Sequence, residues 1–123
     1  DMHLKNFSLI ETAPESDSYV LSPAYDLLPV NVIMPEDREE TALTLNGKKA
    51  GFRKKDFLTF AQTAGISVHA AEAMLRKMIG RTPRWIEMCE NSLLPSDLQE
   101  GLIELIRART ARLVSEPFST GAF

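Results

Sequence analysis

The chain has 123 residues, of which 44% are hydrophobic and 25% are charged, and its formal net charge is −3. This length and composition indicate one globular domain with a modest core, and the acidic balance excludes a general electrostatic attraction to nucleic acid. No apolar run approaches the ~20 residues that a membrane-spanning helix needs, so we expect no membrane contact.

A β-hairpin is predicted near the start of the chain. Apolar and polar residues alternate over 7–10 and again over 19–21, and the polar segment 12–18 between them contains a proline and several turn-forming side chains. Such a hairpin would bring Asn6 and Asp26 to neighbouring strand ends.

The next segments are predicted to be a loop and a second hairpin. Residues 29–40 contain two prolines and a run of acidic side chains, which favours an irregular surface loop. Residues 43–45 then alternate into Asn46-Gly47, a strong turn signal, and a short return strand through 50–52 is expected.

The second half of the chain reads as helical. Apolar residues at helical spacing predict a helix over 54–64 that ends at Gly65, and Ser67 is a suitable N-cap for the next helix. That second helix would bury Met74 and Met78, and Met88 is also expected in the core. The single cysteine, Cys89, has apolar neighbours, excludes an internal disulfide and favours a buried thiol in a reducing, cytoplasmic setting.

Two more helix starts are predicted from capping signals. Thr82 would cap a helix whose first residue is Pro83, and Ser96 with Gln99 has the spacing of a capping box. The last helix, 96–115, is expected to bury one apolar stripe: Leu98, Leu102, Leu105, Ile106 and Leu113.

Together these elements predict a mainly α fold with a small β-hairpin element, of the α+β class. We expect a single domain with a catalytic and metal-binding loop and hairpins over 1–52, a helical subdomain over 53–115 and a frayed tail over 116–123.

A phosphotransferase motif opens the chain. Asp1 is followed five positions later by Asn6, the spacing of a kinase catalytic loop in which the Asp accepts a hydroxyl proton and the Asn helps to hold Mg²⁺. A kinase also needs a later metal-binding Asp, and Asp26 lies after the predicted hairpin. Carboxylate and amide oxygens are the ligands that Mg²⁺ prefers, so Asn6 and Asp26 are the candidate metal ligands.

The sequences Asp1-Met2-His3-Leu4-Lys5-Asn6-Phe7-Ser8 and Ser22-Pro23-Ala24-Tyr25-Asp26-Leu27-Leu28 resemble the HipA-like serine/threonine kinases of bacterial toxin–antitoxin systems. The segment 43–48 and the helical tail fit the same family. The resemblance covers nearly all of this chain and about the last third of such a kinase, so we expect a C-terminal fragment that is inactive alone. We expect the Gly-rich phosphate loop and the nucleotide-binding strand lysine of such a kinase to lie upstream of Asp1 in the parent protein.

The resemblance implies a catalytic role for Asp1 and metal binding by Asn6 and Asp26. It also implies ATP binding by His3, Leu4, Lys5, Asn6, Tyr25 and Asp26. The implied cofactor is Mg²⁺ with ATP as co-substrate, and the implied substrate is a protein Ser/Thr, with aminoacyl-tRNA synthetases among the family's targets. The implied partner is a helix-turn-helix antitoxin, through which alone DNA would be reached.

Two alternatives stay open from the sequence. The chain could be a non-catalytic helical interaction module, or part of a small-molecule phosphotransferase that uses the same loop. The basic cluster Lys48, Lys49, Arg53, Lys54 and Lys55 could face an antitoxin, an acidic substrate or DNA, although a solvated hairpin end is the simpler interpretation.

Overall fold

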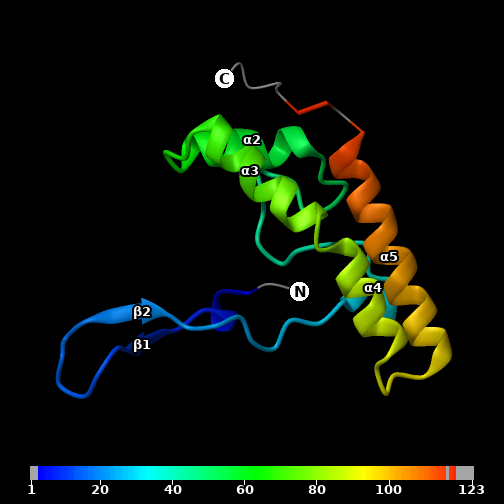
Figure 1. The fold of residues 1–123 in the computed structure, drawn as a ribbon, viewed down its shortest axis with the longest axis horizontal. Helices are drawn as coiled ribbons and strands as arrows, with labels where there is room; N and C mark the ends of the chain where they lie inside the picture. Colours follow the sequence, from blue (N-terminus) through cyan, green and yellow to red (C-terminus); the bar gives the residue numbers. More distant parts are fainter. Residues whose placement is uncertain (1–2, 116, 119–123) are drawn as a thin grey trace.

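The computed structural model describes residues 3–115 and 117–118 and has a two-stranded hairpin beside a helical body (Figure 1). The predicted fold class, mainly helical with a small hairpin, is confirmed. The strands are β1 (Leu9–Glu11) and β2 (Tyr19–Leu21), and the helices are α1 (Val30–Ile33), α2 (Lys54–Thr63), α3 (Val68–Ile79), α4 (Thr82–Glu90) and α5 (Ser96–Val114).

The hairpin forms where the alternating pattern predicted it, although β1 begins two residues later than expected. β1 and β2 are antiparallel with Leu9 opposite Leu21 and Ile10 opposite Val20. The hairpin projects from the helical body, and every residue of both strands is exposed. Its two faces therefore carry apolar side chains that the described part of the chain does not cover.

The expectation of an irregular loop over 29–40 was wrong in one part, because α1 occupies Val30–Ile33. Pro29 precedes the helix, where its fixed φ is tolerated, and Pro35 keeps the residue before it, Met34, out of the helical region, at φ −128° and ψ 81°. α1 packs on α5 beside Gly101, where an added Cβ would lie 3.4 Å from Val32.

The second predicted hairpin is reduced to its turn. Asn46 and Gly47 both have positive φ (52° and 74°), which gives the expected tight turn, but only the single bridge Leu45–Lys48 flanks it. The Asn46 side chain donates to the backbone oxygen of Asp56 at 2.6 Å, so the turn is fastened to α2 and not to a long partner strand.

The connection from α2 to α3 confirms both predicted caps. Gly65 has φ +74°, and the amides of Gly65 and Ile66 donate to Gln62 and Ala61 at 3.1 and 2.8 Å, which is a Schellman motif. The Ser67 hydroxyl accepts from the amide of Ala70 at 3.2 Å and so caps α3.

The predicted caps of the last two helices were wrong. α4 begins one residue earlier than expected: its N-cap is Arg81, and the Thr82 hydroxyl instead meets that of Thr110 on α5 at 3.2 Å. α5 does begin at Ser96, but Ser96 is not its cap. The Gln99 side chain donates to the backbone oxygen of Ser92 at 3.0 Å, so packing of the preceding loop replaces the capping box.

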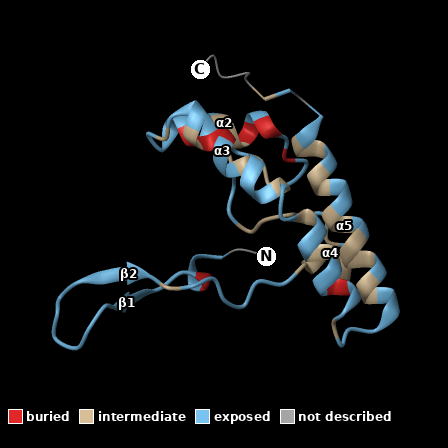
Figure 2. Cartoon of the chain, viewed as in Figure 1, coloured by how far each residue is buried: buried red, intermediate tan, exposed pale blue. Residues whose placement is uncertain are grey.

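The buried core is small and lies chiefly where α2 and α3 meet (Figure 2). Its apolar members among the described residues are Phe52, Ala61, Ala71 and Cys89, so the buried thiol is confirmed. Burial of the three methionines was wrong, because Met74, Met78 and Met88 are each more than half exposed. The leucine stripe of α5 is half-buried. The methionine side chains have no further layer of described chain over them.

Candidate functional site

Asn6 is held by a single 3₁₀ turn, Leu4–Asn6, and is one of the few buried polar residues, at 6% exposure. The turn closes through backbone bonds from Asn6 to His3 and from Phe7 to Leu4, at 3.0 and 3.1 Å. The Asn6 Oδ1 also accepts from the backbone amide of His3 at 2.8 Å. The side chain is therefore fixed on its oxygen side by the loop that carries it.

The other end of the Asn6 amide reaches across the base of the hairpin. Its Nδ2 donates to the backbone oxygen of Asp26 at 2.9 Å, with a longer contact of 3.5 Å to that of Tyr25. The predicted approach of Asn6 and Asp26 is confirmed. Asp26 has φ +51°, a left-handed conformation that Asp adopts more readily than most residues.

A second link joins the same two segments. The Tyr25 hydroxyl donates to the backbone oxygen of Lys5 at 2.9 Å. The Asn6 side chain thus bonds to the backbone of the turn, and the Tyr25 side chain bonds to the backbone of the loop. These two bonds hold the loop and the turn together although most of the surrounding residues are exposed.

Asn6 and Asp26 supply the hard oxygens that Mg²⁺ prefers, although in this structure Asn6 faces the Asp26 backbone with its Nδ2 and the His3 amide with its Oδ1. Asp26 is exposed, and Asn6 Oδ1 retains a second lone pair after accepting from His3. Two hard oxygen ligands suffice for Mg²⁺ only when substrate phosphates and waters complete the octahedron. Within residues 3–115 and 117–118, no group of three or more His, Cys, Asp and Glu side chains is arranged to hold a metal.

Comparison with protein families settles which fold family contains this loop and hairpin. A family model described as the HipA-like C-terminal domain matches residues 1–86. The chain belongs to this family. A comparison with curated proteins finds no match. Every predicted site residue lies inside the matched HipA-like segment, whereas α5 lies beyond it.

The remaining predicted site residues of the HipA-like domain either are exposed to solvent or lie outside the residues that the structure describes. Asp1, the predicted catalytic residue, lies outside the described residues. His3, Leu4 and Lys5 are all exposed, Leu4 at 75%. In the part of the chain that is described, no helix has the length and apolarity that crossing a bilayer would require.

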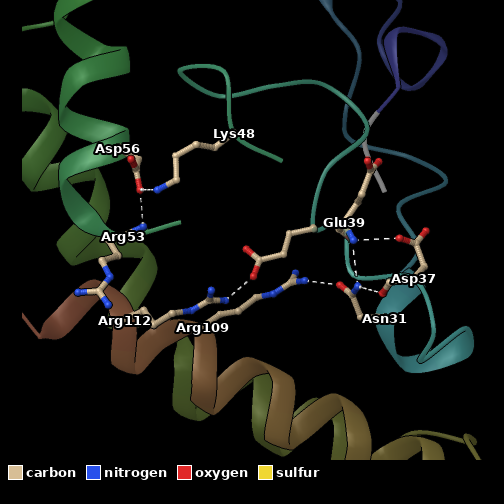
Figure 3. Close-up of polar contacts among 9 residues, drawn as sticks. Asn31, Asp37, Glu39, Lys48, Arg53, Asp56, Arg109 and Arg112 are labelled. Carbon is tan, nitrogen blue, oxygen red and sulfur yellow. Dashed lines mark hydrogen bonds and ion pairs between the residues drawn. The ribbon is translucent and has the colours of Figure 1, made fainter. Parts of the chain in front are cut away.

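The basic cluster is not a free cationic surface, because three of its five members make ion pairs, and the interpretation as a solvated hairpin end was wrong for Lys54, which is buried. Lys48 pairs with Asp56 at 2.8 Å (Figure 3). Lys49 pairs with Glu39 at 2.9 Å. Lys54 is buried 3.8 Å from Glu72, and its ammonium also meets the backbone oxygen of Pro117 and the ring of Phe118.

Sequence reasoning missed the polar contacts that fix the segment after Asp26 to α5. Arg109 Nη2 donates to Asn31 Oδ1 at 2.6 Å, and Arg112 Nη2 donates to Glu40 Oε1 at 2.7 Å (Figure 3). We call these four residues the α5 clamp. Desolvation lowers the pKa of Arg109 below its ordinary value, and its buried Nε has no hydrogen-bond partner in the structure. These pairs are 78 and 72 residues apart, so no local pattern could have revealed them.

Proposed function

We propose that this chain provides the catalytic loop and the metal-binding turn of an ATP- and Mg²⁺-dependent protein serine/threonine kinase. The observation that carries the proposal is the Asn6–Asp26 link, which joins the loop and the later acidic turn across the base of the hairpin. A kinase needs its loop Asn and its metal-binding Asp beside each other. Membership of the HipA-like family supports the same assignment to kinase chemistry.

The roles follow from the position of each side chain. Asp1, by its place in the motif, would orient the substrate hydroxyl and accept its proton. Asp26 and the Oδ1 of Asn6 would hold the metal. Bound Mg²⁺ would neutralise charge on the nucleotide phosphates. The exposed Lys5 ammonium would stabilise charge on the transferred phosphoryl group, with His3 beside it.

Leu4 and Tyr25 would have supporting roles in nucleotide binding. Leu4 presents an exposed apolar side chain to the nucleotide, and Tyr25 fixes the loop through its bond to Lys5. Phosphoryl transfer depends mainly on positioning and electrostatics, so a loop held by two hydrogen bonds suits the reaction better than a mobile one.

The biological setting proposed here is a toxin–antitoxin pair. The kinase would be the toxin, with protein Ser/Thr residues such as those of an aminoacyl-tRNA synthetase as substrate and a helix-turn-helix antitoxin as partner. The formal charge of −3 and the pairing of Lys48 and Lys49 with carboxylates argue against direct DNA binding by this chain.

A second candidate function is protein docking without catalysis, and the exposed methionines favour it. Met74, Met78 and Met88 are 57%, 53% and 58% exposed, and flexible methionines adapt to varied apolar partners. Docking alone gives Asp1 and Asp26 no task, so substitution of either residue separates the two functions.

The deciding experiment measures growth arrest and transfer of radiolabelled phosphate from ATP to protein by the kinase that includes this chain. We expect Asp1→Asn and Asp26→Asn to abolish both, while the exposed Asp97→Asn, at the start of α5, leaves both unchanged. Unchanged transfer in Asp26→Asn would exclude the metal role, and unchanged growth arrest with both variants would favour docking. The 123-residue chain alone is expected to transfer no phosphate.

A further inference from the structure

We infer that Arg109 and Arg112 are positioning residues for the metal-binding turn, acting through the segment that follows Asp26. The inference rests on the proposed role of Asp26 as a metal ligand. It adds a dependence of that site on α5, which lies beyond the matched HipA-like residues 1–86.

The clamp closes a compact loop before it reaches α5. The Asn31 side chain donates to the backbone oxygens of Asp37 and Glu39 at 2.6 and 3.0 Å, while its Oδ1 accepts from Arg109. One amide group therefore fastens both ends of segment 31–39 together and to α5 (Figure 3). Arg109 thus acts on the whole loop through a single contact.

The second contact of the clamp secures the end of the same loop. Glu40 is 14% exposed and Arg112 is 31% exposed, so their 2.7 Å ion pair is partly shielded from solvent. The Glu40 amide also donates to the backbone oxygen of Lys49 at 2.8 Å. Charge-assisted bonds of this length have about twice the strength of neutral ones, so they can hold a segment with few buried apolar contacts.

The path from the clamp to Asp26 is short. α1 begins at Val30, four residues after Asp26, and Pro29 restricts the backbone between them. On the other side, the turn is held by the Asn6 bond to the Asp26 backbone oxygen and by the Tyr25 bond to the backbone oxygen of Lys5. Leu27 and Leu28 are exposed, so packing does not fix this stretch. Asn6 and Tyr25 thus hold the turn on one side, and the clamp holds the segment that follows it on the other.

The composition of the clamp also argues against a role in stability alone. Arg109 leaves its buried Nε without a partner, and apolar residues commonly replace buried ionic contacts without loss of stability. A well-packed apolar side chain at position 109 would hold α1 on α5. It could not donate a hydrogen bond to Asn31, so it would not fix the conformation of the loop 31–39.

The test uses NMR of the 123-residue chain with two readouts. The first is hydrogen exchange at the amides of Val32 and Met34, which donate to the backbone oxygens of Pro29 and Val30 at 2.8 and 2.7 Å, with the Ile66 amide as an internal reference. The second is broadening of the Asn6 and Asp26 amides by Mn²⁺ in place of Mg²⁺.

We compare Arg109→Met/Arg112→Met with the control Arg107→Met, an exposed arginine of the same helix. We expect the double variant to exchange about tenfold faster at Val32 and Met34, with Ile66 unchanged. It should also need roughly three times more Mn²⁺ for equal broadening. Glu40→Arg should raise the exchange rates and the Mn²⁺ requirement by a smaller amount. The charge-swapped variant Glu40→Arg/Arg112→Glu should return both toward the wild-type values. If the double variant does not fold, the same two measurements are made on Glu40→Gln, for which we expect changes in the same direction.

Unchanged exchange at Val32 and Met34 would overturn the inference and leave the proposed kinase function intact. Faster exchange with unchanged Mn²⁺ broadening would show that the clamp holds α1 without positioning Asp26, which also overturns it. The proposed metal site fails if Mn²⁺ does not broaden the Asn6 and Asp26 amide signals in the wild type, or if Asp26→Asn leaves that broadening unchanged. The inference then fails with it.

Discussion

Asp56→Asn should be among the more damaging single polar substitutions in the chain. Asp56 is 7% exposed, and its Oδ2 accepts from Lys48 Nζ and from the backbone amide of Arg53, both at 2.8 Å. It also sits at the third position of α2, where a carboxylate satisfies a backbone donor and opposes the helix dipole. The carboxylate joins the Asn46-Gly47 turn to the start of α2.

The magnitude follows from these two bonds. Neutralising the acceptor weakens the Arg53 bond by about 1 kcal/mol, because charged hydrogen bonds contribute about twice as much as neutral ones. The Lys48 side chain is 41% exposed, so solvent screening limits that pair to ~0.2–1 kcal/mol. We expect a total loss of about 1–2 kcal/mol in the free energy of unfolding at neutral pH, or roughly 3–8 °C in Tm.

The loss should depend on pH in a defined direction. The Lys48 bond, followed by the Arg53 amide, lowers the pKa of Asp56 below 3.8 in the folded state. A lowered carboxyl pKa contributes stability above 3.8, and this contribution disappears as the pH falls through the folded-state pKa. The difference between Asp56→Asn and the wild type should therefore be largest near neutrality and shrink in acid.

Urea unfolding monitored by far-UV circular dichroism and by Trp85, the one tryptophan, measures both quantities. Glu36→Gln is the control, because Glu36 is an exposed loop carboxylate, and its substitution should change stability by less than ~0.5 kcal/mol. Equal unfolding midpoints for Asp56→Asn and Glu36→Gln would refute the reasoning. So would a difference from the wild type that stays constant from neutral to acidic pH.

Two glycines should respond to alanine in opposite directions, each measured by the same urea titration. Gly65→Ala should destabilise the chain by about 1–2 kcal/mol, because φ is +74° and nothing lies within 4 Å to compensate. Stability at or above that of the wild type would contradict the Schellman cap. Gly101→Ala should stabilise it by roughly 0.5–1 kcal/mol, since it lies inside α5 and the new methyl would meet Val32 at an acceptable 3.4 Å. A loss of stability there would show that α1 cannot move by a few tenths of an ångström.

The elements that local patterns control could be predicted from sequence. Gly65 and Ser67 act through bonds to residues within five positions, so their spacing contains the information. The approach of Asn6 to Asp26 was predictable because a short hairpin brings its two ends together whatever lies beyond it. The catalytic role of Asp1 stays a prediction.

The failures share a tertiary cause. Gln99 had the spacing of a capping box but donates to Ser92, because the loop before α5 folds back over its first turn. Met74 and Met78 had the period of a buried stripe but have no described layer over them. Periodicity shows that a helix has an apolar face, and it does not show that the face is covered.

The α5 clamp has a consequence for how the proposed site should be understood. The hairpin is exposed on both faces and Asn6 is the only buried residue at its base among those described, so apolar burial contributes little to the site's rigidity. Rigidity must then come from directional contacts, and the strongest of these on the far side of Asp26 originate from Arg109 and Arg112. A phosphotransferase site needs its ligands held within fractions of an ångström. A helix without any proposed catalytic residue is therefore an integral part of the site, because it limits where Asp26 can lie.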